Sequence, residues 1–230
     1  MLTAEKMAQL RARGSSADRM ARIGVAVNAR LQASQGVQKV ETDLVDMYVY
    51  HDFLPPVQRD YLIARIDQHA FPSKLYAADP DAGFRTSSSC DMDRHDWDIR
   101  AIDQRISHLL GVMEEFGETL QGQRYAVGQQ FKPHQDYFHA TEPYWKAEVH
   151  GGGQRTWTAM AFLNDVLAGG QTEFTDLGVS VEPRAGTLLI WNNIGADGEP
   201  NALTMHAGRP VAEGTKYIIT KWFRENPWGV

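Results

Sequence analysis

The second half of the chain is a series of short segments of β-type pattern, separated by turns rich in glycine and proline. Seven segments follow residue 120, at 123–131, 155–165, 170–176, 179–183, 186–193, 203–211 and 215–225. Evenly spaced short strands with such turns are typical of β-sandwiches and barrels. In the last segment two sets of side chains alternate, namely Tyr217, Ile219, Lys221 and Phe223 against Lys216, Ile218, Thr220 and Trp222. The pattern therefore predicts a barrel or jelly roll.

The first part of the chain has a helical period instead. Residues 3–33 read as helical with a break at 14–16, and one apolar stripe follows from Met20, Ile23, Val27 and Leu31. Two further helices are predicted, one opened by Pro55-Pro56 and one whose buried face is Ile99, Ile102, Ile106 and Leu109. We predict an α+β protein with a mainly β core, divided into a helical extension at 1–40 and a domain at 41–230 whose core spans about residues 118–225. Long loops are predicted at 76–96 and 139–153.

The composition narrows the class of protein. The chain has 230 residues, 43% of them hydrophobic and 23% charged, as in an ordinary globular domain. A net charge of −6 without a concentrated basic patch argues against a nucleic-acid partner. A single cysteine, Cys90, excludes an internal disulfide framework and fits a reducing compartment. Because no secretory signal and no stretch of about 20 apolar residues is present, we expect a cytoplasmic protein without membrane contact. For its oligomeric state, we expect a monomer or a homodimer.

Three residues could form a metal site. His134 and Asp136 are two positions apart near the end of a predicted strand, so their side chains point to the same face. His206 lies on a late predicted strand that could close a barrel beside the first. Two imidazoles and one carboxylate leave three coordination positions open, which suits a non-haem Fe(II) enzyme that binds a co-substrate together with O₂. A structural zinc site would require a fourth protein ligand.

A buried cation is predicted near this site. Lys216 opens the last strand and shares a face with Ile218, Thr220 and Trp222. A cation that enters a barrel lined by such side chains is costly unless it meets a carboxylate. The position of Lys216 therefore indicates an ion pair with a dicarboxylate bound to the metal.

Four stretches with these residues resemble the Fe(II)- and 2-oxoglutarate-dependent oxygenases of the prolyl 4-hydroxylase family. They are "RYAVGQQFKPHQDYF", "GGQRTWTAMAFLNDVLAGGQTEF", "VEPRAGTLLIWNN" and "HAGRPVAEGTKYIITKWFRE". The resemblance covers roughly residues 85–224 and implies a double-stranded β-helix, the jelly roll of this family. It implies that His134, Asp136 and His206 bind iron and that Lys216 binds the distal carboxylate of 2-oxoglutarate. It also implies O₂ as co-substrate and ascorbate as reductant.

Further site residues are expected from the same resemblance. Tyr125, Thr158 and Trp222 match positions around the co-substrate, and Arg155 matches a substrate-side arginine. Phe131 stands where many relatives have tyrosine and Phe162 where some have it, and each replacement removes one hydroxyl group. Tyr144 and Trp145, in the predicted 139–153 loop, are candidates to cover a substrate.

The implied activity is hydroxylation of prolyl residues in a peptide or protein, with release of succinate and CO₂. Two alternatives remain open. The same chemistry could act on a free amino acid or another small metabolite, or the jelly roll could bind a ligand without catalysis, as a cupin-like module.

Overall fold

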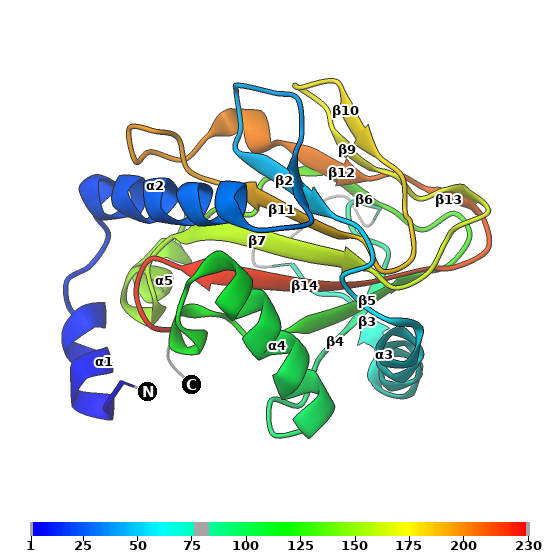
Figure 1. The fold of residues 1–230 in the computed structure, drawn as a ribbon, viewed down its shortest axis with the longest axis horizontal. Coiled ribbons are helices and arrows are strands. Elements are labelled where there is room, and N and C mark those ends of the chain that lie inside the picture. Colours follow the sequence, from blue (N-terminus) through cyan, green and yellow to red (C-terminus); the bar gives the residue numbers. More distant parts are fainter. Residues whose placement is uncertain (1, 76–82, 229–230) are drawn as a thin grey trace.

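The computed structural model describes residues 2–75 and 83–228, which form two facing antiparallel sheets with helices on one side (Figure 1). The large sheet has the strand order β1 (Val37–Lys39), β2 (Met47–Tyr50), β11 (Leu188–Asn192), β7 (Arg155–Phe162), β14 (Lys216–Arg224), β5 (Gln121–Tyr125), β4 (Ser88–Asp91) and β3 (Phe71–Pro72). The small sheet has the order β10 (Val179–Val181), β9 (Thr172–Phe174), β12 (His206–Gly208) and β6 (Phe131–His134). A separate pair joins β8 (Ala168–Gly169) and β13 (Val211–Glu213).

Most of the helices precede the core strands in the sequence. The helices are α1 (Ala4–Arg11), α2 (Ala17–Ala33), α3 (Pro56–His69), α4 (Trp97–Leu110) and α5 (Trp145–Gly151), with short 3₁₀ turns at Glu114–Phe116 and Ala202–Thr204. Figure 1 shows α2, α3 and α4 on the outer face of the large sheet, away from the small sheet. No helix within the described residues is both long enough and apolar enough to cross a bilayer.

The two faces of the last strand build two separate cores. On β14, Ile219 and Phe223 pack with the buried sides of α2, α3 and α4, whereas Ile218 packs between the two sheets with Phe162 and Trp191. This is the alternation predicted from the sequence, and it follows from the period of two along a strand. The jelly roll and its helical cover are confirmed.

Local sequence signals explain the ends of the central helix. Asp96 caps α4, because its carboxylate accepts hydrogen bonds from the backbone N–H groups of Asp98 and Ile99. Gly111 ends the helix at φ 71°, a left-handed conformation that favours glycine. Between these two ends, Ile99, Ile102 and Ile106 of the predicted apolar stripe are buried. Its fourth position needs correction, because Leu110 is buried and the predicted Leu109 is only partly buried beside it.

Two loop predictions need correction. Part of the expected 76–96 loop is strand β4, which pairs with β5 in the large sheet; residues 76–82 of that loop lie outside the described residues. The expected 139–153 loop contains helix α5. Both elements are short and polar, so neither shows a clear local period. Their positions are set by partners distant in sequence, such as the ion pair at 2.5 Å between Glu148 of α5 and Arg224 of β14.

Candidate metal centre and adjoining cleft

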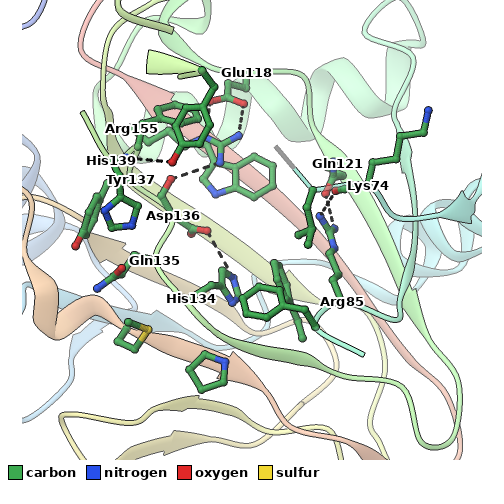
Figure 2. A pocket seen from close by; sticks show the side chains of 18 of the residues that line it. Lys74, Arg85, Glu118, Gln121, His134, Gln135, Asp136, Tyr137, His139 and Arg155 are labelled. Atoms are coloured by element: carbon green, nitrogen blue, oxygen red, sulfur yellow. Dashed lines mark hydrogen bonds and ion pairs between the residues drawn. The ribbon is translucent and has the colours of Figure 1, made fainter. Parts of the chain in front are cut away.

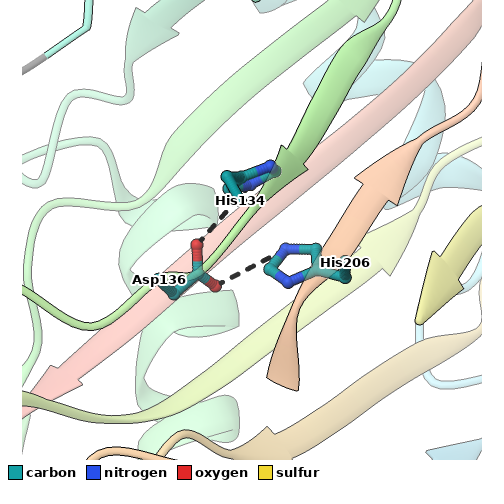
Figure 3. Close-up of side chains that lie close together, drawn as sticks. All are labelled: His134, Asp136 and His206. Carbon is teal, nitrogen blue, oxygen red and sulfur yellow. Dashed lines mark ion pairs between the residues drawn. The ribbon is translucent and has the colours of Figure 1, made fainter. Parts of the chain in front are cut away.

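The three predicted metal ligands lie together between the two sheets. His134 ends β6, Asp136 follows it by two residues, and His206 begins β12 directly opposite His134 in the strand pairing. The Nε2 atoms of His134 and His206 lie 3.9 and 4.0 Å from the two carboxylate oxygens of Asp136 (Figure 3). One potential ligand atom from each of the three side chains lies within 4.8 Å of those of the other two. The three side chains thus converge on one point.

Backbone carbonyls orient both imidazole rings. The Nδ1 of His134 lies 2.8 Å from the Lys132 carbonyl oxygen, and the Nδ1 of His206 lies 2.9 Å from that of Thr204. An Nδ1–H that donates to a carbonyl leaves the Nε2 lone pair available for a metal. Burial, followed by the nearby His206, lowers the pKa of His134 to about 3. His134 is therefore neutral at physiological pH, the form that coordinates metal ions.

Asp136 stays ionised in spite of its burial. Burial by itself acts to raise the pKa of this carboxyl, but His206, His134 and Arg155 together with a hydrogen bond outweigh it, and the net direction is downward. That hydrogen bond comes from the Thr158 hydroxyl, which donates to Oδ2 at 2.7 Å and accepts one from the Asn193 amide at 2.9 Å. The carboxylate is thus both charged and fixed in rotation.

This donor set fits Fe(II). Two imidazoles and one carboxylate form a facial triad with open positions, the arrangement of non-haem iron oxygenases. The only cysteine, Cys90, is buried on β4 and is not part of the group. The triad is also the only group of three potential ligands found within the described residues.

Lys216 lies in an inner pocket next to the triad. Its side chain is 2% exposed, and its ammonium donates to the Thr172 hydroxyl at 3.3 Å. Burial lowers the pKa of Lys216 to about 7, and no carboxylate pairs with it among the residues that the structure describes. A buried ammonium without an anionic partner is costly. The pocket therefore suits a ligand that carries a carboxylate.

The other residues predicted around the co-substrate differ in their positions. Tyr125 and Trp222 line the inner pocket, and the Tyr125 hydroxyl donates to Gln123 at 2.8 Å. Thr158 instead faces Asp136. The phenylalanines that replace family tyrosines also lie here. Phe131 stacks on the His134 ring with centroids 3.5 Å apart, and the Phe162 ring lies 5.4 Å from the Lys216 ammonium, where it offers a cation–π contact.

A larger cleft of about 630 Å³ opens beside the triad (Figure 2). Its walls carry seven aromatic side chains, namely Phe84, Phe131, Tyr137, Phe138, Tyr144, Trp222 and Trp228. Arg155 lies in this cleft, and its guanidinium donates two hydrogen bonds to the Glu118 carboxylate, at 2.6 and 2.7 Å. The same guanidinium lies over the Trp222 ring, 4.2 Å from the ring centroid. Of the two loop candidates, Tyr144 lines the cleft, whereas Trp145 is not among the lining residues.

Sequence reasoning missed two polar residues of the site. Arg85 lines both cavities, lies 4.8 Å from the Phe131 ring, and donates to Ser87 and Gln121. It stands in the predicted 76–96 loop, where no pattern distinguishes it from a solvated arginine. Glu118 precedes the first core strand, and its carboxylate pairs with Arg155 and Arg224, which come from two other strands.

Comparisons with known proteins agree with this geometry. Residues 120–224 match the family model of the 2OG-Fe(II) oxygenase superfamily, where 2OG is 2-oxoglutarate. This part of the chain is similar to that superfamily. Within the superfamily, the prolyl 4-hydroxylase resemblance is confirmed by similarity to probable prolyl 4-hydroxylase 8 of Arabidopsis thaliana, 36% identical over 52% of this chain and 41% of that protein. Prolyl 4-hydroxylase subunit alpha-2 of Gallus gallus is 30% identical over 86% of this chain and 38% of that protein.

Solved structures share the fold. The viral collagen prolyl hydroxylase of Paramecium Bursaria Chlorella virus-1 superposes with a TM-score of 0.61 at 24% identity, over 77% of this chain and 95% of that one. A prolyl hydroxylase from Trichoplax adhaerens also gives a TM-score of 0.61, at 14% identity, over 90% of this chain and 91% of that one. The chain spans about two fifths of the length of the curated relatives it matches. The superfamily uses Fe(II), 2-oxoglutarate and O₂, and the donor set and the buried Lys216 fit these groups.

Proposed function

We propose that the protein is an Fe(II)- and 2-oxoglutarate-dependent dioxygenase that hydroxylates prolyl residues in a peptide or protein. One observation carries the proposal: the triad of His134, Asp136 and His206 shares a pocket with a buried ammonium, that of Lys216, which lacks a carboxylate partner within the described residues. A metal site with three open positions beside a carboxylate receptor suits a dicarboxylate that chelates the metal.

Each of these residues has a distinct part. His134 and His206 would bind Fe(II) through Nε2 and Asp136 through a carboxylate oxygen. When bound, the iron would supply the redox chemistry that couples conversion of 2-oxoglutarate and O₂ to succinate and CO₂ with hydroxylation of a substrate C–H bond. Lys216 would hold the far carboxylate of the co-substrate and so orient its 2-oxo acid end toward the triad. Tyr125 and Trp222 line the same pocket and would exclude water around that ion pair.

The larger cleft beside the triad supports the proposal of a peptide substrate. Tyr137 and Tyr144 line the cleft beside the triad and offer ring faces on which a pyrrolidine ring can pack. The named relatives are prolyl 4-hydroxylases, which supports the same substrate class. Arg155 is anchored by Glu118, and both line the cleft, where Arg155 would hold the surface against which the substrate lies.

Four further proposals concern the reductant, the compartment, the domain division and the oligomeric state. Ascorbate is the proposed external reductant, as the family resemblance implies. The cytoplasm is the proposed compartment, supported by the single, unpaired and buried Cys90. The division into a helical extension at 1–40 and an oxygenase domain at 41–230 stays a prediction, as does the monomeric or homodimeric state.

The test is to incubate the protein with Fe(II), 2-oxoglutarate, ascorbate, air and a panel of proline-containing peptides. Succinate and peptide mass are followed together. The expected result is a gain of one oxygen on proline that is absent with His134→Ala. Succinate without a modified peptide would direct the search to free amino acids and small metabolites. If neither product forms while the protein is folded and binds metal, the catalytic proposal is refuted and a ligand-binding jelly roll remains.

A further inference from the structure

The segment that carries Asp136 is irregular in backbone and yet buried. Asp136, Tyr137 and Phe138 follow the end of β6 outside any strand or helix, and they are 6, 9 and 3% exposed. Buried backbone N–H and C=O groups that lie outside regular structure need hydrogen-bond partners from elsewhere. The position of the Asp136 carboxylate therefore depends on whichever groups hold this segment, which we call the ligand loop (residues 136–138).

Gln154 holds the ligand loop with its side-chain amide. Its Oε1 accepts a hydrogen bond from the Phe138 backbone N–H at 2.6 Å, and its Nε2 donates to the Phe138 carbonyl at 2.8 Å. Gln154 is 3% exposed and directly precedes β7, the strand that also carries Thr158, the hydrogen-bond donor to Asp136. One strand thus fixes both the carboxylate and the backbone that follows it.

Gln154 is itself held by a buried carboxylate. Its backbone N–H donates to Oε1 of Glu225 at 2.8 Å, and Glu225 is fully buried. The other oxygen of Glu225 accepts hydrogen bonds from the Arg19 guanidinium at 2.8 Å and from the Ser16 backbone N–H at 3.1 Å. Ser16 caps α2, and Arg19 lies in the first turn of that helix. A continuous path of hydrogen bonds therefore joins the N-terminal helices to the ligand loop.

We propose that Gln154 is a positioning residue for the metal centre and that Glu225 couples it to the start of α2. The inference rests on the proposed Fe(II) site, and it means that the N-terminal helices help to place the ligands of that site. Metal–ligand distances tolerate deviations of only about 0.2 Å. Removing groups that orient the ligands of a metal typically lowers metal affinity by about 10- to 100-fold.

The experiment measures the dissociation constant for Mn(II), a redox-stable probe of the same ligands, by electron paramagnetic resonance of the free ion. It compares the wild type with Gln154→Ala, Glu225→Gln and Arg19→Ala at a temperature well below each melting temperature. The dissociation constant is expected to rise about tenfold or more for Gln154→Ala and about two- to fivefold for the other two. A purely structural role would lower the melting temperature and leave the affinity of the folded protein unchanged.

Arg30→Ala is the matched control for Arg19→Ala. Arg30 also belongs to α2 and also supports distant backbone, since it donates to the His108 carbonyl at 2.7 and 2.9 Å. Its removal is expected to leave Mn(II) affinity at the wild-type value.

Three results would overturn the inference. Wild-type affinity in Gln154→Ala would refute the positioning role. If that variant does not fold, wild-type affinity in Arg19→Ala refutes the coupling to α2. A wild type that binds no Mn(II) would refute the proposed metal centre and the inference with it, and this outcome is recognised before any variant is made.

Discussion

Replacing Lys216 by Met is expected to have opposite effects on the ligand-free protein and on its complex with 2-oxoglutarate. Burial lowers the pKa of this ammonium from 10.5 to about 7. A tenfold change in proton affinity is worth about 1.4 kcal/mol, so burial of the charged side chain costs about 5 kcal/mol at most. Methionine has a similar length and avoids this cost. It loses the hydrogen bond to Thr172 and the contacts with two aromatic rings, together worth about 2–3 kcal/mol.

The net expectation is a ligand-free variant more stable than the wild type by about 2–3 kcal/mol. For a chain of this size, the melting temperature should rise by about 5–10 °C near pH 7. The unfolded chain keeps the Lys216 proton up to about pH 10.5, whereas the folded chain releases it near pH 7. The stability of the wild type therefore increases with pH in this window, and the advantage of the variant shrinks.

The affinity for 2-oxoglutarate should change in the other direction. Removal of one partner from a buried ion pair costs about 2–5 kcal/mol, and 3 kcal/mol corresponds to about 100-fold in Kd. Calorimetric titration of the Mn(II)-loaded protein with 2-oxoglutarate measures the change in Kd. Thermal unfolding from pH 7 to 10 measures the difference in stability between the variant and the wild type.

Lys221→Met is the control, because Lys221 is buried on the opposite face of the same strand and pairs with Asp103 at 2.6 Å. It should lower the melting temperature and leave 2-oxoglutarate affinity unchanged. A Lys216→Met variant that is less stable than the wild type at pH 7, or that binds 2-oxoglutarate equally well, would contradict the reasoning.

Three further substitutions probe other parts of the molecule. Thr158→Val removes the hydroxyl that fixes Asp136 and should weaken Mn(II) binding about tenfold in the same resonance assay; unchanged affinity would show that the carboxylate needs no such support. Ile106→Ala leaves a cavity in the core beneath α4 and should lower the free energy of unfolding, measured in urea, by about 2–5 kcal/mol. A loss below about 1 kcal/mol would contradict this expectation. Tyr144→Ala should raise the KM for a peptide substrate severalfold without changing Mn(II) affinity, whereas Trp145→Ala, outside the cleft lining, should change neither; equal effects of the two would refute the role of Tyr144.

The metal centre could be predicted because its signals are local or follow from strand order. His134 and Asp136 are two residues apart, and a period of two places them on one face. His206 was identifiable because a late strand of a jelly roll can lie beside an early one, and in the structure it pairs directly with His134. Lys216 was identifiable because its neighbours of the same face are largely apolar, which makes a cation conspicuous.

Other features depend on partners that no local pattern reveals. Gln154 reads as a polar linker residue, and its role becomes visible only when the fold brings Phe138 and Glu225 to it. Arg155 was expected to face a substrate, yet two of its guanidinium nitrogens bond Glu118, which lies 37 residues earlier. Strand β4 lacks an apolar run, and its place between β3 and β5 becomes visible only in the folded sheet.

In the proposed reaction, one site uses a single O₂ molecule to oxidise both 2-oxoglutarate and a prolyl residue. The most direct test supplies ¹⁸O₂ in unlabelled water, with Fe(II), 2-oxoglutarate and the peptide panel, and analyses both products by mass spectrometry. We expect one labelled oxygen in succinate and one in the hydroxylated proline, in equal amounts, and neither product with His206→Ala. Hydroxylated peptide without labelled succinate, or products that persist in that variant, would contradict it.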